Sequence, residues 1–209
     1  MAIISNGTTI ADAGAFSASL GALVHIKTIT LSSAAGGIAF VDGSSSVVLD
    51  DTYPIYKFEM LILHPSASSE FEFNMSIDTG SNYNATKTTT SFYTIHAENG
   101  SQGNLYYVAA EDTAQGTGYQ NLHYGSQLGT NNDCCFDGEL YLFNPSSTTF
   151  VKQFMARGHY LDSRSPQYTY DCYTGGYINS TSAVDAVRFQ MGSGNLDAGI
   201  IKLYGIKDS

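Results

Sequence analysis

Charged residues are scarce in this sequence, and tryptophan is absent. Asp, Glu, Lys and Arg make up 13% of the 209 residues, about half of the ~25% that is usual in soluble domains. The 19 acidic residues outnumber the 9 basic ones, which gives a formal net charge of −10 at pH 7. A chain with this charge repels phosphate backbones and anionic membrane surfaces. We therefore expect no nucleic acid among its partners.

Long apolar segments are also missing. No run approaches the ~20 consecutive apolar residues that span a bilayer, so we expect no membrane insertion. Residues 1–20 lack the basic start and the long apolar core of a secretion signal. The sequence therefore predicts synthesis in a cytoplasm, without export by the general secretory route.

Cysteines are few, with only Cys134, Cys135 and Cys172 in the chain. An odd number that includes one adjacent pair does not form a disulfide framework. Zinc sites need about two to four residues between paired cysteines. We expect reduced, partly buried thiols, and a bridge from Cys172 to one of the other two cysteines is the alternative.

The sequence is rich instead in strand-forming residues and in turns, with 15 Tyr, 11 Phe and 21 Gly. Residues 70–77 alternate polar and apolar side chains, which predicts a strand that buries Phe71, Phe73, Met75 and Ile77 on one face. Similar segments recur about every 8–12 residues between turn signals, and none has a convincing helical period. The expected strands are 23–31, 38–41, 55–63, 70–77, 86–95, 105–108, 139–143, 149–157, 167–178, 184–191 and 200–206.

This pattern predicts an all-β protein, an antiparallel β-sandwich that is jelly-roll-like. Residues 1–20, rich in Ala, Ser, Gly and Thr, are expected to form an extended N-terminal arm or attachment segment. Residues 21–209 then form a single β-sandwich domain. The last two strands, 184–191 and 200–206, flank a Gly/Asn/Asp turn. We expect them to pair as a hairpin that closes the sandwich.

No motif for catalysis or for cofactor binding is present. The five histidines lack metal-ligand spacing, and the chain has neither a nucleophile elbow nor a phosphate-binding glycine loop. Residues 78–82 are oxygen-rich like a calcium loop but lack the full EF-hand spacing, so we expect a plain turn. The sequence predicts no catalytic residue, no cofactor, no metal and no enzymatic activity; a glycan-degrading enzyme stays a minor alternative.

The best candidates for recognition lie in two segments. One is a long, Gly-rich polar loop, 111–133, and loops of this length are usually functional or disordered. The other is the Tyr-rich segment 160–177, together with Arg157 and His159 just before it. Tyr and Arg anchor many interfaces, and Tyr suits stacking on sugar rings; alternatively, half of these tyrosines alternate into the core. The candidate binding residues are Tyr119, His123, Tyr124, Arg157, His159, Tyr160, Arg164, Tyr168, Tyr170 and Tyr173.

Several segments resemble small virion proteins of marine tailed bacteriophages. They are 56–58 with 63–66, 76–83, 140–152, 181–189 and the terminal segment 188–207. The resemblance implies a structural component of the virus particle, located on the virion after assembly in the host cytoplasm. It implies a jelly-roll-like fold, no catalytic activity, other virion proteins as partners and a homotrimer.

Two positions on the particle fit this resemblance. The first is a tail-associated fibre or receptor-binding component, whose ligand would be a host-surface glycan or receptor. The second is a capsid decoration (cement) protein that stabilises the head shell. The long tyrosine-bearing segments favour the fibre.

Overall fold

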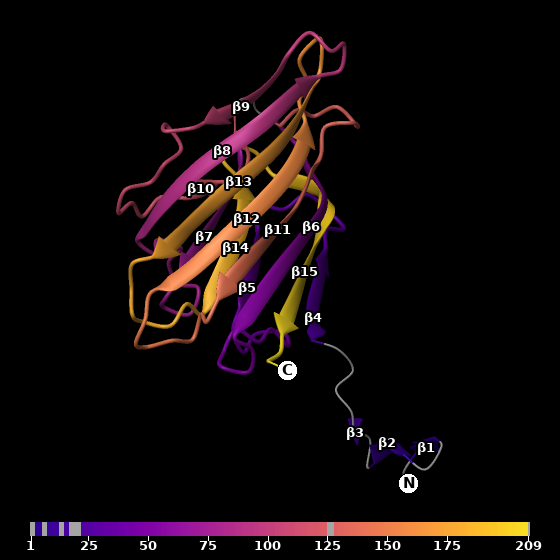
Figure 1. Ribbon diagram of the computed structural model, residues 1–209, viewed down its shortest axis with the longest axis vertical. Helices are drawn as coiled ribbons and strands as arrows, with labels where there is room; N and C mark the ends of the chain where they lie inside the picture. Colours follow the sequence, from indigo (N-terminus) through magenta and orange to yellow (C-terminus); the bar gives the residue numbers. More distant parts are fainter. Residues whose placement is uncertain (1–2, 6–7, 13–14, 17–21, 125–127, 209) are drawn as a thin grey trace.

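The computed structural model describes residues 3–5, 8–12, 15–16, 22–124 and 128–208. Two antiparallel sheets pack face to face around one hydrophobic core, with the larger sheet in front of the smaller one in Figure 1. The predicted all-β antiparallel sandwich is therefore confirmed. In the part of the chain described, no helix is long and apolar enough to cross a membrane.

The larger sheet has eight strands and the smaller one has four. In spatial order, the larger sheet contains β4 (Leu23–Thr30), β15 (Leu196–Ile206), β6 (Ile55–Pro65), β11 (Phe136–Phe143), β12 (Lys152–Leu161), β13 (Tyr168–Ile178), β8 (Lys87–Ala97) and β9 (Gly103–Tyr107). The smaller sheet contains β10 (Gln120–Asn121), β7 (Phe71–Ser76), β14 (Ala186–Met191) and β5 (Ile38–Val41).

The pairing of the strands defines a jelly roll. The first strand of the sandwich pairs with the last, β4 with β15, and further inward β5 pairs with β14, β6 with β11 and β7 with β10. The β15–β6 and β14–β7 ladders then join these pairs side by side within each sheet. The eight strands thus form one long antiparallel hairpin rolled into two sheets, which is the jelly-roll arrangement.

Two insertions enlarge this jelly roll. The hairpin β8–β9 lies in the chain between β7 and β10, and the strands β12–β13 lie between β11 and β14. All four join the larger sheet beyond β11, in the order β12, β13, β8, β9. The larger sheet therefore consists of four jelly-roll strands and four added strands.

Phenylalanine rings fill the space between the two sheets. On the smaller sheet, Phe73 meets Phe154 of the larger sheet edge to face at 5.2 Å, and Phe189 meets Phe58 at 5.4 Å between ring centroids. All four side chains are at most 1% exposed. Alternation along each strand sends one face of every sheet into this core, as the sequence pattern predicts.

The predicted C-terminal hairpin is wrong. β14 pairs with β5 and β7 in the smaller sheet, whereas β15 pairs with β4 and β6 in the larger one. The connection between β14 and β15 crosses the end of the sandwich, where Ser193 N–H and Asn195 N–H donate to the hydroxyls of Ser69 and Ser66. A short turn looks the same in sequence whether it reverses a strand within a sheet or carries the chain across to the other sheet.

The buried face predicted for residues 70–77 holds for three of its four residues. Phe71, Phe73 and Met75 are fully buried, but Ile77 is 38% exposed. The strand ends at Ser76 because the Ser76 hydroxyl donates to the Asp78 carboxylate at 2.7 Å and begins a turn. Ile77 therefore lies in the turn and not on the ladder.

The predicted polar loop 111–133 is mostly irregular in its described residues, but parts of it join the sandwich. It contains β10, and the buried side chains of Leu122, Tyr124 and Leu128 belong to the core. Leu128 also exchanges two backbone hydrogen bonds with Ser69. Residues 125–127 are outside the described part of the chain.

The predicted arm, residues 1–20, contains three short strands: β1 (Ile3–Ser5), β2 (Thr8–Asp12) and β3 (Ala15–Phe16). They pair antiparallel with one another in a separate three-stranded sheet. Residues 1–2, 6–7, 13–14 and 17–21 lie outside the described part of the chain, so the arm and its boundary stay a prediction.

Candidate binding face on the larger sheet

The larger sheet exposes a row of aromatic side chains on the face that points away from the core. Tyr107 of β9, Phe92 of β8 and Tyr173 of β13 are direct neighbours in the strand register, and we call these three residues the aromatic row. Tyr107 is 66% exposed and Phe92 is 40% exposed. The rings of Phe92 and Tyr173 stack, with centroids 4.8 Å apart and planes 9° from parallel.

Two aliphatic side chains lie on the same face. Leu105 points outward from β9 and is 67% exposed, and Met155 of β12 is 55% exposed. With the aromatic row they make an apolar surface on the four added strands. Exposed apolar surface of this kind marks contact sites on soluble proteins.

The aromatic row continues into charged side chains on the jelly-roll strands. In the register, Arg157 of β12 lies beside Tyr173, Glu139 of β11 beside Arg157, and Glu59 of β6 beside Glu139. The Arg157 guanidinium lies 5.2 Å from the centre of the Tyr173 ring. A cation at this distance from a ring face is attracted by it, so Arg157 extends the stack of Phe92 and Tyr173.

Asp171 of β13 ties this stack together. Arg157 Nε and Nη2 donate to its two carboxylate oxygens at 2.9 and 2.7 Å, and the Tyr173 hydroxyl donates to the same group at 3.1 Å. The hydrogen bond from Arg157 is the main reason that the pKa of Asp171 is lowered. The bidentate pair holds the guanidinium plane in a fixed orientation.

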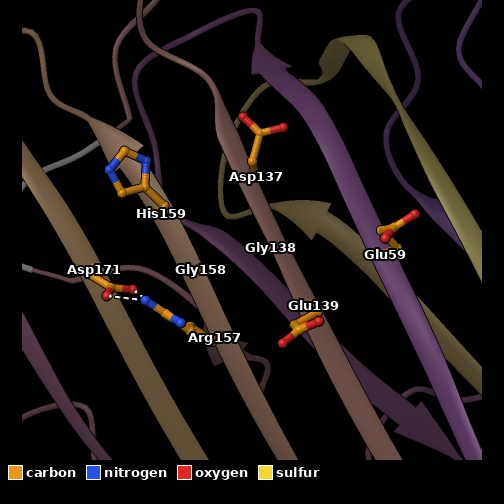
Figure 2. A pocket seen from close by; sticks show the side chains of 8 residues that line it. All are labelled: Glu59, Asp137, Gly138, Glu139, Arg157, Gly158, His159 and Asp171. Carbon is orange, nitrogen blue, oxygen red and sulfur yellow. Dashed lines mark hydrogen bonds and ion pairs between the residues drawn. The ribbon is translucent and has the colours of Figure 1, made fainter.

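A depression of about 420 Å³, lined mostly by charged side chains, lies directly beside the row. It is lined by side chains of β6, β11, β12 and β13, and the backbone of Gly138 and Gly158 lies among them (Figure 2). The six side chains are those of Glu59, Asp137, Glu139, Arg157, His159 and Asp171. Arg157 and Asp171 belong to both the depression and the aromatic stack, so the two features form one continuous surface.

Neighbouring atoms leave no room for a Cβ at either glycine. A Cβ on Gly158 would lie 2.1 Å from Cζ of Phe136, and one on Gly138 would lie 2.6 Å from the Arg157 carbonyl oxygen. Gly138 and Gly158 lie on the side of β11 and β12 that faces the core, and core atoms already occupy the space there. The sheet can therefore bring β11 and β12 together here only with glycine at both positions.

Each of the four carboxylates of the depression has a partner, and that of Asp171 is Arg157. Glu139 forms an ion pair with Lys57 at 2.9 Å, and Glu59 lies 3.6 Å from Lys202. Asp137 accepts the Ile62 N–H at 2.8 Å, at a β-bulge in β6. These contacts orient the carboxylates, and each still has free lone pairs toward solvent because a carboxylate accepts about four hydrogen bonds.

Three of the predicted binding residues belong to this face. Arg157 and Tyr173 lie in the stack, and His159 lines the depression, where its Nε2 is 2.7 Å from the hydroxyl oxygen of Thr169. The structure therefore brings these three residues together, as the sequence interpretation proposed.

Four other predicted residues are buried, and a role for them in surface recognition is wrong. His123, Tyr124, Tyr160 and Tyr170 are each at most 2% exposed. Tyr160 stacks on Tyr170 at 4.5 Å, and its hydroxyl donates to the Tyr124 carbonyl at 2.6 Å. Their polar atoms form internal hydrogen bonds, which is how buried tyrosines are normally accommodated.

The last three predicted residues lie elsewhere. The Arg164 guanidinium packs 4.3 Å from the ring centre of Tyr168, and Tyr168 is half-buried against the core. Tyr119 is half-buried, and burial raises its pKa; its charged neighbours, Arg188 and Glu72, belong to the smaller sheet. None of the three joins the aromatic row.

Sequence reasoning missed Phe92, Tyr107, Leu105 and Met155. A signal for Phe92 was present, because it occupies the same face of its strand as Thr88, Thr90 and Thr94. Single exposed aromatic residues are common on protein surfaces, so this signal is weak on its own. Recognising it required knowing which face of the strand is buried.

The described residues hold no group of three or more His, Cys, Asp or Glu side chains arranged for a metal ion. The oxygen-rich segment 78–82 is a turn, in which Asp78 accepts from the Asn82 backbone and side chain at 2.9 and 2.7 Å. All three cysteines are free thiols. Burial raises the pKa of Cys172 to about 12, which makes this thiol a poor nucleophile.

Comparison with known proteins finds no relative: no family model matches the chain, and no curated protein or solved structure matches it significantly.

Proposed function

We propose that this chain is a non-catalytic structural protein of a virus particle and serves as a tail-associated fibre or receptor-binding component. The observation that carries the proposal is the position of the aromatic row. Tyr107, Phe92 and Tyr173 all lie on strands added to the jelly roll, and Tyr107 and Phe92 are exposed to solvent. The added strands are not needed to complete the jelly roll, so a contact surface explains both their presence and their composition.

Further support comes from the fold and from the sequence resemblance to phage virion proteins. Jelly rolls are common in viral capsid and lectin domains. In the proposed arrangement the chain acts as a homotrimer that contacts other virion proteins, and residues 1–20 attach it to the particle. The outer face of the larger sheet points toward the host.

Immunogold electron microscopy of intact particles, with an antibody against this chain, tests the proposal. We expect label at the tail. Label spread evenly over the head would replace the fibre with the second candidate, a capsid decoration protein, in which the aromatic row contacts the shell. The absence of label from any particle would refute a virion role.

A further inference from the structure

We infer that the aromatic row and the adjoining depression bind an oligosaccharide whose sugars are neutral or carry amino groups, and that they reject acidic sugars. This inference rests on the proposed function, because it names the ligand of the same face. It depends on three observations: an exposed apolar ridge, a depression continuous with it and lined mostly by charged side chains, and the sign of the charge in that depression.

The apolar ridge offers exposed hydrocarbon to the C–H face of a sugar ring, mainly at Tyr107 and Phe92, because Tyr173 is covered by Phe92 on one side and by Arg157 on the other. Phe92 and Tyr173 stand stacked on neighbouring strands, and Tyr107 follows on the next strand. Neighbouring strands lie about 4.8 Å apart, so the ridge offers contacts at successive positions along an extended ligand. Aromatic rings supply a large apolar area at a low cost in side-chain entropy.

The depression supplies the polar half of the contact. Asp171 and Arg157 are fixed by their bidentate pair, and Glu139 is fixed by Lys57. Fixed carboxylate and guanidinium groups hydrogen-bond to neighbouring hydroxyls with little loss of entropy on binding. A ligand that presents an apolar face and a hydroxylated edge side by side is therefore complementary to this surface.

Charge decides which sugars fit. Four carboxylates line the depression, those of Glu59, Asp137, Glu139 and Asp171. Three of them are paired with the cations Lys202, Lys57 and Arg157, so four negative and three positive charges leave one excess negative charge here. The chain as a whole carries a net charge of −10. A uronic acid, a sialic acid or a sulfated sugar would place a further anion against these carboxylates, and like charges in an interface oppose binding. Neutral hydroxyls and protonated amines meet no such repulsion.

An array of neutral, aminated and acidic oligosaccharides of matched length, probed with the full chain, tests the inference. We expect binding to neutral or aminated members and none to acidic ones. Hits confined to acidic members, or no hits at all, would overturn it. A tail label in the particles together with an empty array would reject the glycan and leave the fibre role standing, whereas unlabelled particles would reject the fibre role itself.

Matched variants locate the binding on the face. Phe92→Ala and Tyr107→Ala should each weaken the binding of the best array member by about tenfold or more. Phe150→Ala serves as the control, because Phe150 is 69% exposed in the connection between β11 and β12 and lies outside the row. Equal affinity in all three variants would overturn the assignment.

Sedimentation of the same variants excludes another occupant of the face. If a second copy of the chain covered the row, Phe92→Ala would change the oligomeric state. We expect the same sedimentation coefficient for the original chain, Phe92→Ala and Phe150→Ala. A change confined to Phe92→Ala would show that the row is a subunit contact and would overturn the inference.

Discussion

Lys87 is a lysine without exposed surface, and its replacement by methionine should make the stability of the protein respond differently to pH. It is the first residue of β8, the strand that carries Phe92, and it is 0% exposed. Its ammonium group donates to Asn74 Oδ1 at 2.8 Å and also to the backbone carbonyls of Ala85 and Gly118. Lys87 thus links the start of the added strand β8 by a hydrogen bond to β7 of the opposite sheet.

Burial lowers the pKa of Lys87 from 10.5 to about 8, and the nearby Glu72 carboxylate acts in the opposite direction. Between these two pH values the unfolded chain binds more protons than the folded chain. The free energy of unfolding must therefore rise with pH across this window. A shift of about 2.5 units corresponds to about 3 kcal/mol at 1.36 kcal/mol per unit.

Urea unfolding of the original chain and of Lys87→Met, followed by circular dichroism from about pH 7 to about pH 10.5, measures this effect. The difference in the free energy of unfolding between the two chains isolates the contribution of Lys87, because the other titrating groups are the same in both. Tyr124 is such a group: burial raises its pKa to about 12, so it stabilises the fold below pH ~10 and this contribution is lost as the pH rises further.

We expect the stability of the original chain, measured relative to Lys87→Met, to increase by about 3 kcal/mol over this range. The test uses the change of this difference with pH and not its sign at neutral pH, because methionine removes both the buried charge, which is costly, and its hydrogen bonds, which are stabilising. A difference that stays constant with pH would refute the reasoning, because Lys87 would then titrate as it does in the unfolded chain.

Two further predictions concern the sheet beneath the candidate face. Gly158→Ala should destabilise the fold by about 1–3 kcal/mol because the new methyl group would overlap the Phe136 ring, while Gly175→Ala, which meets no atom within 4 Å, should change the unfolding midpoint little. Arg157→Gln should raise the pKa of Asp171, seen by NMR titration, and cost at most about 1 kcal/mol because the Arg157 side chain is 58% exposed. Because the pKa of Asp171 is lowered in the folded chain, its ion pair with Arg157 stabilises the fold above the pKa of the unfolded chain, and this stabilisation is lost in acid. If Arg157→Gln were still less stable than the original chain at a pH where Asp171 is fully protonated, the ion pair would not be the cause.

Part of the candidate face could be predicted from the sequence. Arg157, His159 and Tyr173 were found because they lie in or just before a conspicuous Tyr-rich segment, and they do lie together. Their companions Tyr160 and Tyr170 come from the same segment and point into the core. Alternation along a strand predicts that neighbouring side chains point in opposite directions, but with tyrosines on both faces it does not say which set is buried.

The terminal strands show a second limit. The alternating side chains predict a strand at each of these places, 184–191 and 200–206, but β15 begins at Leu196 and takes in part of the expected Gly/Asn/Asp turn. Their partners do not follow, because β15 pairs with β4, more than 160 residues earlier in the chain. Pairing between strands distant in sequence depends on how the two sheets stack, and no local pattern records it.

The sequence by itself determined the strand-rich composition, the all-β class, the shortage of charge and the absence of a recognisable catalytic motif. These are local or summed properties, and each residue contributes to them independently of its partners. Only the tertiary structure decided the jelly-roll order, the addition of β8, β9, β12 and β13 to one sheet, and the meeting of Phe92, Tyr107 and Tyr173. The reason is that backbone hydrogen bonds join any two strands alike, so the packing of side chains in the core selects which strands become neighbours.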